Sequence, residues 1–183
     1  MTQQRPAMGR AIAAALFMLV ACGQTPEPPK PLAAGWYEFE GSWVASGKRR
    51  TLPMGEDRRA AVIDLGGSLL LAGPNRPGVG FRGNVVGMSD TATGFVGRAV
   101  WTDERGDQVF SELRGQGTAK GNRLTGNFLG GTGRYTGATG GYEFSWQYVH
   151  ETEDGSVQGR AVGLKGRVRL DEKAGAGPQG AGR

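Results

Sequence analysis

Cysteine and histidine are almost absent from this chain. Among 183 residues there is one cysteine, Cys22, and one histidine, His150. A single cysteine cannot form an intrachain disulfide or a thiolate cluster, and a single histidine excludes multi-histidine metal sites. No Gly-x-Ser-x-Gly motif accompanies His150, which argues against a hydrolase built around a nucleophile elbow. We therefore expect neither a metal nor another cofactor.

Long apolar runs are also missing, and the clearest apolar segment lies near the N-terminus. Residues 11–20 form a run of ten apolar residues. A membrane-spanning helix needs about 20 such residues, so this run is too short to cross a bilayer. Arg5 and Arg10 supply a positively charged start, and no acidic residue precedes Glu27. These features are typical of a secretory signal peptide, which we place at residues 1–21.

This segment ends in the sequence Leu19-Val20-Ala21-Cys22. A leucine, two small or aliphatic residues and a cysteine in this order resemble the lipobox of bacterial lipoproteins. The resemblance implies cleavage between Ala21 and Cys22 and alkylation of the Cys22 thiol by diacylglycerol. Because two or more acyl chains anchor a protein stably, an acylated Cys22 would hold the chain on the lipid bilayer. The lipidated thiol would then be lost to catalysis.

The segments on either side of the central region are low in large apolar residues. Residues 22–34 are rich in proline, which favours an extended spacer between the bilayer and a folded domain. An aspartate after the cysteine would suggest inner-membrane retention in some enteric bacteria, and Gly23 stands there instead. The lipoprotein resemblance thus implies a cell-envelope protein, on the periplasmic side of the outer membrane if the source is Gram-negative. We expect residues 171–183 to be a disordered Gly/Ala tail.

Residues 35–170 remain as one domain, and their pattern predicts an all-β fold. No stretch keeps helical periodicity for three turns, whereas β-branched and aromatic residues alternate with polar ones throughout. The connection at residues 47–59 is expected to be longer and charged. The eight strands that we predict are residues 36–46, 60–72, 79–89, 94–102, 108–115, 123–129, 142–149 and 157–170.

The strand faces favour a closed barrel over a sandwich. Tyr142, Phe144, Trp146 and Tyr148 fall on one side of a single strand. An apolar sheet face without helices must be covered by more sheet, in a sandwich or a barrel. Frequent strand glycines, such as Gly83, suit the strong coiling of a barrel. The interior of an eight-stranded barrel is either filled by side chains or able to hold one small ligand.

Two motifs carry a resemblance to a known family. Residues 130–144 read GGTGRYTGATGGYEF, and residues 101–110 read WTDERGDQVF. The first resembles the glycine-rich hairpin of allene-oxide-cyclase and dirigent-like barrels, particularly their uncharacterised bacterial relatives, and the second resembles an Asp-x-x-Gly-Asp turn of those relatives. The resemblance implies an eight-stranded antiparallel barrel with a central cavity, often a homotrimer. No catalytic residue of the plant cyclases matches a position here.

Several side chains are candidates for a site inside such a barrel. Glu112, Arg98 and Arg160 each share a strand side with apolar residues, and a carboxylate in an apolar cavity could act as a general acid or base. Alternatively, these charges form structural Arg–Glu pairs or simply face outward. The aromatic candidates for ligand contact, which could equally be core residues, are Trp101, Phe144, Trp146 and Tyr148.

Three functional hypotheses follow. We favour a non-enzymatic envelope lipoprotein whose barrel binds a small apolar ligand. The second hypothesis is a structural or interaction module with a filled barrel. The third is a cofactor-free isomerase or cyclase that acts by confinement, which needs a polar group inside an apolar cavity. The expected partners are the bilayer, through Cys22, and a small apolar molecule. Nucleic acid is not expected as a partner outside the cytoplasm.

Overall fold

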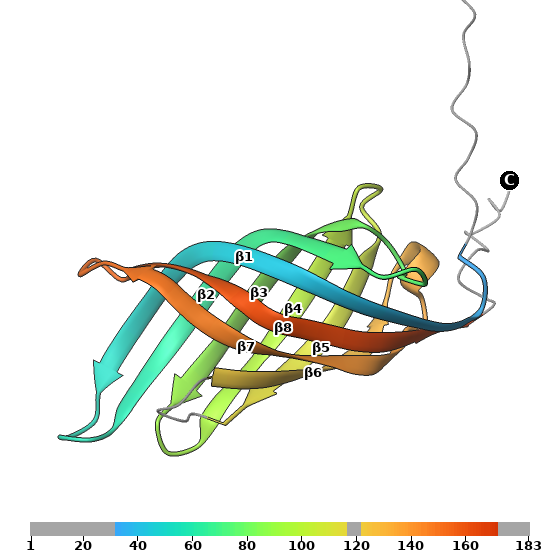
Figure 1. Ribbon diagram of the computed structural model, residues 1–183. Coiled ribbons are helices and arrows are strands. Elements are labelled where there is room, and N and C mark those ends of the chain that lie inside the picture. The colour runs from blue at the N-terminus through green and yellow to red at the C-terminus, as the bar shows by residue number, and fades with distance from the viewer. Residues whose placement is uncertain (1–31, 117–121, 172–183) are drawn as a thin grey trace, which may run out of the picture.

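The computed structural model describes residues 32–116 and 122–171, and nearly all of them belong to one barrel. Eight antiparallel strands pair in chain order, and β8 pairs with β1 to close the sheet (Figure 1). The predicted all-β fold with a closed eight-stranded antiparallel barrel is confirmed. The elements are β1 (Gly35–Pro53), β2 (Arg59–Ala72), β3 (Gly80–Asp90), β4 (Gly94–Asp103), β5 (Gln108–Gly115), β6 (Asn122–Gly131), the short 3-10 helix η1 (Gly133–Tyr135), β7 (Thr139–Glu151) and β8 (Ser156–Leu170).

Three predicted segments lie wholly or mainly outside the described residues. These are the signal peptide at 1–21, the linker at 22–34 and the tail at 171–183. Within the described residues, no helix is long and apolar enough to span a membrane.

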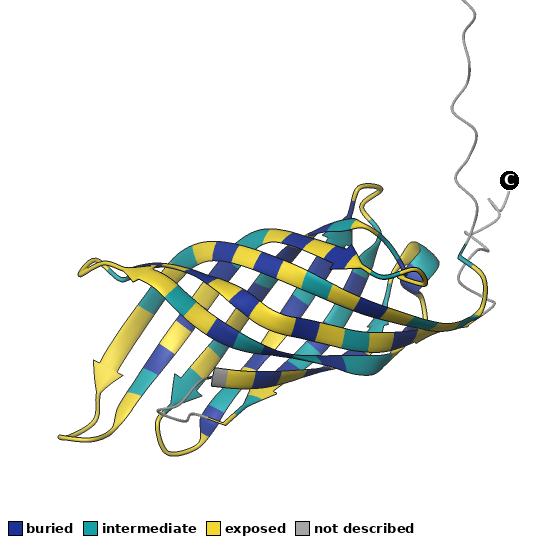
Figure 2. Ribbon diagram, viewed as in Figure 1, coloured by how far each residue is buried: buried dark blue, intermediate teal, exposed yellow. Residues whose placement is uncertain are grey.

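Side chains alternate between the interior and the outer surface along the strands, as the pleat of a strand requires. On β2, Ala61, Ile63 and Leu65 are buried inside, whereas Val62 and Asp64 between them are exposed. Figure 2 shows the resulting alternation of buried and exposed bands across the barrel. The core is therefore a single interior that all eight strands line, with inward and outward side chains alternating along most of their length.

Glycines leave room for the aromatic residues that fill part of this interior. Gly126 on β6 pairs with Tyr142 on β7, and a Cβ atom at Gly126 would overlap the tyrosine ring. The ring of Tyr142 lies 4.7 Å from that of Trp101 and 5.2 Å from that of Phe128, between centroids. Its hydroxyl is 2.8 Å from the Ser111 Oγ, so this buried polar group is paired.

A bulge in β8 changes which residues point inward. The pairing of β7 with β8 shifts register between Glu143 and Ser145, and Gly163 has a φ of +66°. That backbone conformation favours glycine. Ala161 and Leu164 are both buried although they are three residues apart. Strict alternation, which puts Arg160 and Leu164 on one side, therefore fails here.

One end of the barrel is closed by a buried polar cluster. The Arg134 Nη2 atom lies 2.6 Å from an Asp103 carboxylate oxygen, and the Asp103 side chain is fully buried. That carboxylate also accepts hydrogen bonds from the backbone N–H groups of Arg105 and Asp107. The Asp107 carboxylate accepts one in turn from the Arg134 backbone N–H. The two sequence motifs at 101–110 and 130–144 therefore pack against each other.

At the other end of the barrel, the longest strand, β1, extends further than the sequence predicts. We expected a charged connection at residues 47–59, but β1 continues to Pro53 and pairs there with Arg59 on β2. Only Met54 to Arg58 connect the two strands. Up to Arg50 the side chains of this segment alternate between half-buried and exposed, as in the strand before it, so the structure corrects that expectation.

Candidate functional site

The barrel is hollow at the end opposite η1. A cavity of about 430 Å³ opens there, which falls within the range of about 300–1,000 Å³ that is usual for small-ligand sites. Below it, packed side chains around Trp101, Leu113 and Tyr142 leave a void of only about 10 Å³. The interior is therefore a blind cup, open at one end and filled at the other.

The wall of the cup is aliphatic and aromatic. Residues from seven strands line it, and most of its apolar side chains are buried. The apolar lining consists of Trp43, Ala61, Ile63, Leu65, Val85, Phe95, Leu113, Leu124, Phe144 and Trp146. Such a surface has few partners for water and favours contact with an apolar molecule.

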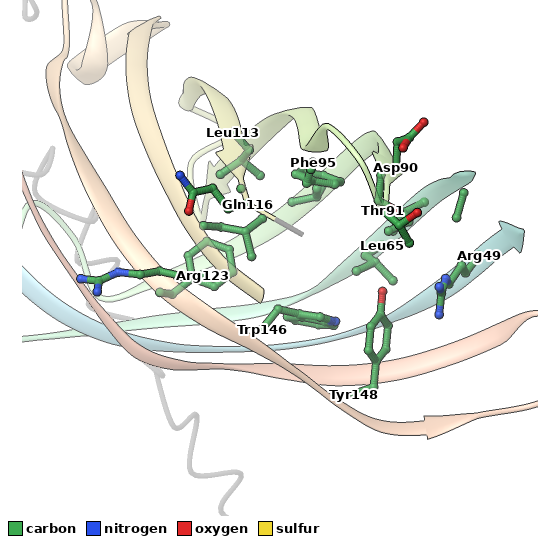
Figure 3. A pocket seen from close by; sticks show the side chains of 18 of the residues that line it. Arg49, Leu65, Asp90, Thr91, Phe95, Leu113, Gln116, Arg123, Trp146 and Tyr148 are labelled. Carbon is green, nitrogen blue, oxygen red and sulfur yellow. The ribbon is translucent and has the colours of Figure 1, made fainter. Parts of the chain in front are cut away.

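Three of the four aromatic candidates line this cavity. Phe144, Trp146 and Tyr148 follow one another on the inner side of β7 (Figure 3 labels the last two). Trp146 also packs against Trp43, with 5.0 Å between ring centroids. Trp101 is buried deeper, in the filled half of the barrel, and does not line the cup.

The three charged candidates lie on the outer surface. The interior sides of β4 and β5 carry Ala99 and Ser111 instead, and Arg98 and Glu112 project outward beside them. The Glu112 Oε2 atom is 3.8 Å from Arg98 Nη1. The two residues thus form an Arg–Glu ion pair between strands, which is one of the alternatives that the sequence left open.

Arg160 is likewise exposed, because the bulge at Gly163 interrupts the alternation of β8. None of the three candidates Arg98, Glu112 and Arg160 has the inward placement that a catalytic role in the cavity requires. Of the alternatives left open for these charges, the outward placement is the one that the structure has.

Sequence reasoning missed the cations that line the cup, which are Arg49, Arg59 and Arg123. Arg49 continues the inward phase of Trp43 and Ala45 along β1, and its guanidinium lies 5.5 Å from the centroid of the Tyr148 ring. Its Nη1 atom donates to the Glu151 carboxylate at 3.1 Å. The run Lys48-Arg49-Arg50 concealed this placement, because three consecutive basic residues are typical of a solvated loop.

Among the described residues that line the cavity, Asp90 is the one acidic side chain. It lies at the rim, where Arg58 Nη2 donates a hydrogen bond of 2.8 Å to its carboxylate. This hydrogen bond, together with one from the Ala92 backbone, holds the pKa of Asp90 below its ordinary value. The described residues include no cluster of three or more metal-ligating side chains.

Tyr148 contributes a neutral hydroxyl near the mouth. Burial raises the pKa of this phenol, so it keeps its proton at neutral pH and can donate a hydrogen bond. The polar groups around the cup are thus mainly donors, and its depth is apolar.

Comparisons with known proteins do not identify a relative of this chain. No family model matches this chain, and neither the curated proteins nor the solved structures provide a match. The function must therefore be argued from the cup itself.

Proposed function

We propose that this chain is a membrane-anchored envelope lipoprotein whose barrel binds a small apolar molecule in the cup. The observation that carries the proposal is a cavity of ligand size, lined by aliphatic and aromatic side chains and open to solvent at one end. Transfer of an apolar molecule from water to such a wall is favourable. The cavity-lining carboxylate, Asp90, is paired with Arg58 at the rim, which supports binding rather than acid–base chemistry.

The position of the chain ends supports an anchor that leaves the mouth free. β1 begins beside the end of β8, where Gly35 pairs with Leu170, and this is the closed end of the barrel (Figure 1). A tether that reaches from an acylated Cys22 to β1 would join the barrel at that end. The mouth would then lie at the far end from the tether. Replacement of Cys22 by serine should move the protein from the membrane to the soluble fraction of fractionated cells.

Ligand binding can be tested with the full chain carrying Cys22→Ser, which removes the acylation site. A neutral naphthylamine dye, N-phenyl-1-naphthylamine, should bind and gain fluorescence in the apolar cup. Ala61→Phe places a ring in the cavity, because Ala61 is buried and lines it. We expect this variant to weaken dye binding by about tenfold or more, equivalent to about 1.4 kcal/mol.

Val62→Phe is the matched control, since Val62 is the next residue of β2 and faces solvent. It should leave dye affinity within about twofold of the parent, a change worth less than about 0.5 kcal/mol. Thermal unfolding of both variants checks that the barrel stays folded. Equal dye binding by Ala61→Phe and the parent, or no binding by any of the proteins, would show that the cup is not the ligand site.

A further inference from the structure

Hydrogen-bond donors without acceptors gather around the cup. The indole Nε1 atoms of Trp43 and Trp146 and the Nε atom of Arg49 are buried, and none of them has a hydrogen-bond partner among the described residues. All three side chains line the cavity. A buried donor without a partner is costly, so native structures usually satisfy such groups. Of the three, Arg49 lies at the mouth, where an acceptor brought by a bound molecule would reach its guanidinium.

These donors are close to one another along one side of the cup. Trp146, Tyr148 and Arg49 follow in succession toward the mouth (Figure 3). The rings of Trp146 and Tyr148 are 5.9 Å apart between centroids, and the Arg49 guanidinium is 5.5 Å from the Tyr148 ring. The apolar residues Ile63, Leu65 and others form the rest of the wall. Polar and apolar side chains therefore meet near the mouth, where Arg49 on β1 pairs with Ile63 on β2.

The mouth also carries a positive charge that no carboxylate neutralises. Glu151 is bonded to one nitrogen of Arg49, and Asp90 is paired with Arg58. Arg59 lies on the inward side of β2 with Ala61, and within the described part of the chain no acidic side chain forms an ion pair with it. A cation at the opening of an apolar cavity is poorly screened and attracts anions.

We infer that the ligand is an amphiphile with an apolar body and an oxyanion head, a carboxylate or a phosphate. The body occupies the apolar wall of the cup, and the head accepts hydrogen bonds from Arg49 and Arg59 at the mouth. Arginine is suited to this task because its planar guanidinium donates to two oxygens at once. This inference rests on the proposed function and adds the chemical class of the ligand.

The test compares three probes with the same twelve-carbon chain: dodecanoate, dodecyl phosphate and uncharged dodecanol. Each displaces N-phenyl-1-naphthylamine from the full chain carrying Cys22→Ser, below the micellar concentration of the probe. We expect at least one charged probe to bind about tenfold or more tightly than dodecanol, as charge-assisted hydrogen bonds predict. The probe with the larger preference identifies the head group.

Two variants test whether Arg49 and Arg59 cause the preference for charged probes. The double variant Arg49→Met and Arg59→Met should bring charged and neutral probes to within about threefold of each other, because the charged probes lose their guanidinium partners. Arg50→Met is the matched control, because Arg50 follows Arg49 on β1 but is exposed on the outer side. This control should keep the preference.

The outcomes separate the inference from the function on which it rests. Equal affinity for all three probes would overturn the inference that the ligand has an oxyanion head, and the proposal that the cup binds apolar molecules would stand. A preference that survives in the double variant would overturn the assignment to Arg49 and Arg59. If neither the dye nor any probe binds the parent chain, the proposed function itself fails.

Discussion

Replacing Arg134 with methionine should destabilise the barrel far more than the same replacement of Arg123, a surface arginine whose ion pair is equally short. Arg134 is 2.6 Å from Asp103, and their side chains are 12% and 0% exposed. Arg123 is also 2.6 Å from its partner, Glu143, but the Arg123 side chain is 70% exposed. Removing one partner of a buried pair costs about 3–5 kcal/mol, because the other charge stays buried and uncompensated. Exposed pairs contribute about 0–1 kcal/mol.

Urea unfolding followed by tryptophan fluorescence measures both losses in the free energy of unfolding. Adding Asp103→Asn to Arg134→Met should recover part of the loss, since it removes the unpaired charge and keeps an oxygen for the backbone N–H groups of Arg105 and Asp107. Similar small losses, below about 1 kcal/mol, for Arg134→Met and Arg123→Met would refute the argument that burial decides the strength of the closed-end pair.

Two further predictions concern packing and charge. Gly126→Ala should cost about 1–3 kcal/mol in urea unfolding, because its methyl group overlaps the Tyr142 ring, whereas Gly80→Ala, whose nearest neighbour is 3.9 Å from the added atom, should change stability little. Hydrogen bonds from Arg123 and Lys165 lower the pKa of Glu143 from its ordinary value of 4.5. The ionised carboxylate therefore stabilises the folded state at higher pH, and this contribution is lost as the pH falls through the lowered pKa. In an NMR titration Arg123→Met should raise that pKa; an unchanged midpoint would show that Arg123 does not hold it down.

The strands could be predicted from the sequence because their periodicity is local. Alternation on β2 and β7 depends on residues two apart, and the buried faces of both strands follow it. The end of β1 could not be found in the same way. There the alternating residues are Arg49 and Thr51 rather than apolar side chains, so hydropathy carries no signal although the backbone pairing continues to Pro53.

The phase of a strand was harder to predict than its existence. On β4, Arg98 and Trp101 are three residues apart and must face opposite sides of the sheet. Both were candidates for the interior, and the larger apolar residue takes it. On β8 the bulge at Gly163 breaks the rule itself. Glycine marks bulges only sometimes, and this domain has many glycines, so the signal at Gly163 was hidden among them.

The contact between the two sequence motifs could not be predicted from their spacing in the chain. Residues 101–110 and 130–144 are separated by two strands, yet Asp103 and Asp107 hold the Arg134 segment through an ion pair and a backbone hydrogen bond. This contact closes one end of the barrel and keeps its buried polar groups away from the cup.

The polar groups at the two ends of the barrel differ in charge balance. At the closed end, the Arg134 guanidinium meets the buried Asp103 carboxylate, although the Arg134 Nε atom and the Tyr135 hydroxyl have no hydrogen-bond partner among the described residues. Unpartnered polar atoms therefore occur at both ends and do not by themselves require a ligand. The mouth differs because Arg59 lies at the opening of an apolar cavity, and no carboxylate of the described residues forms an ion pair with it. A cation in that position attracts anions, which is the reason to expect a ligand with an oxyanion head.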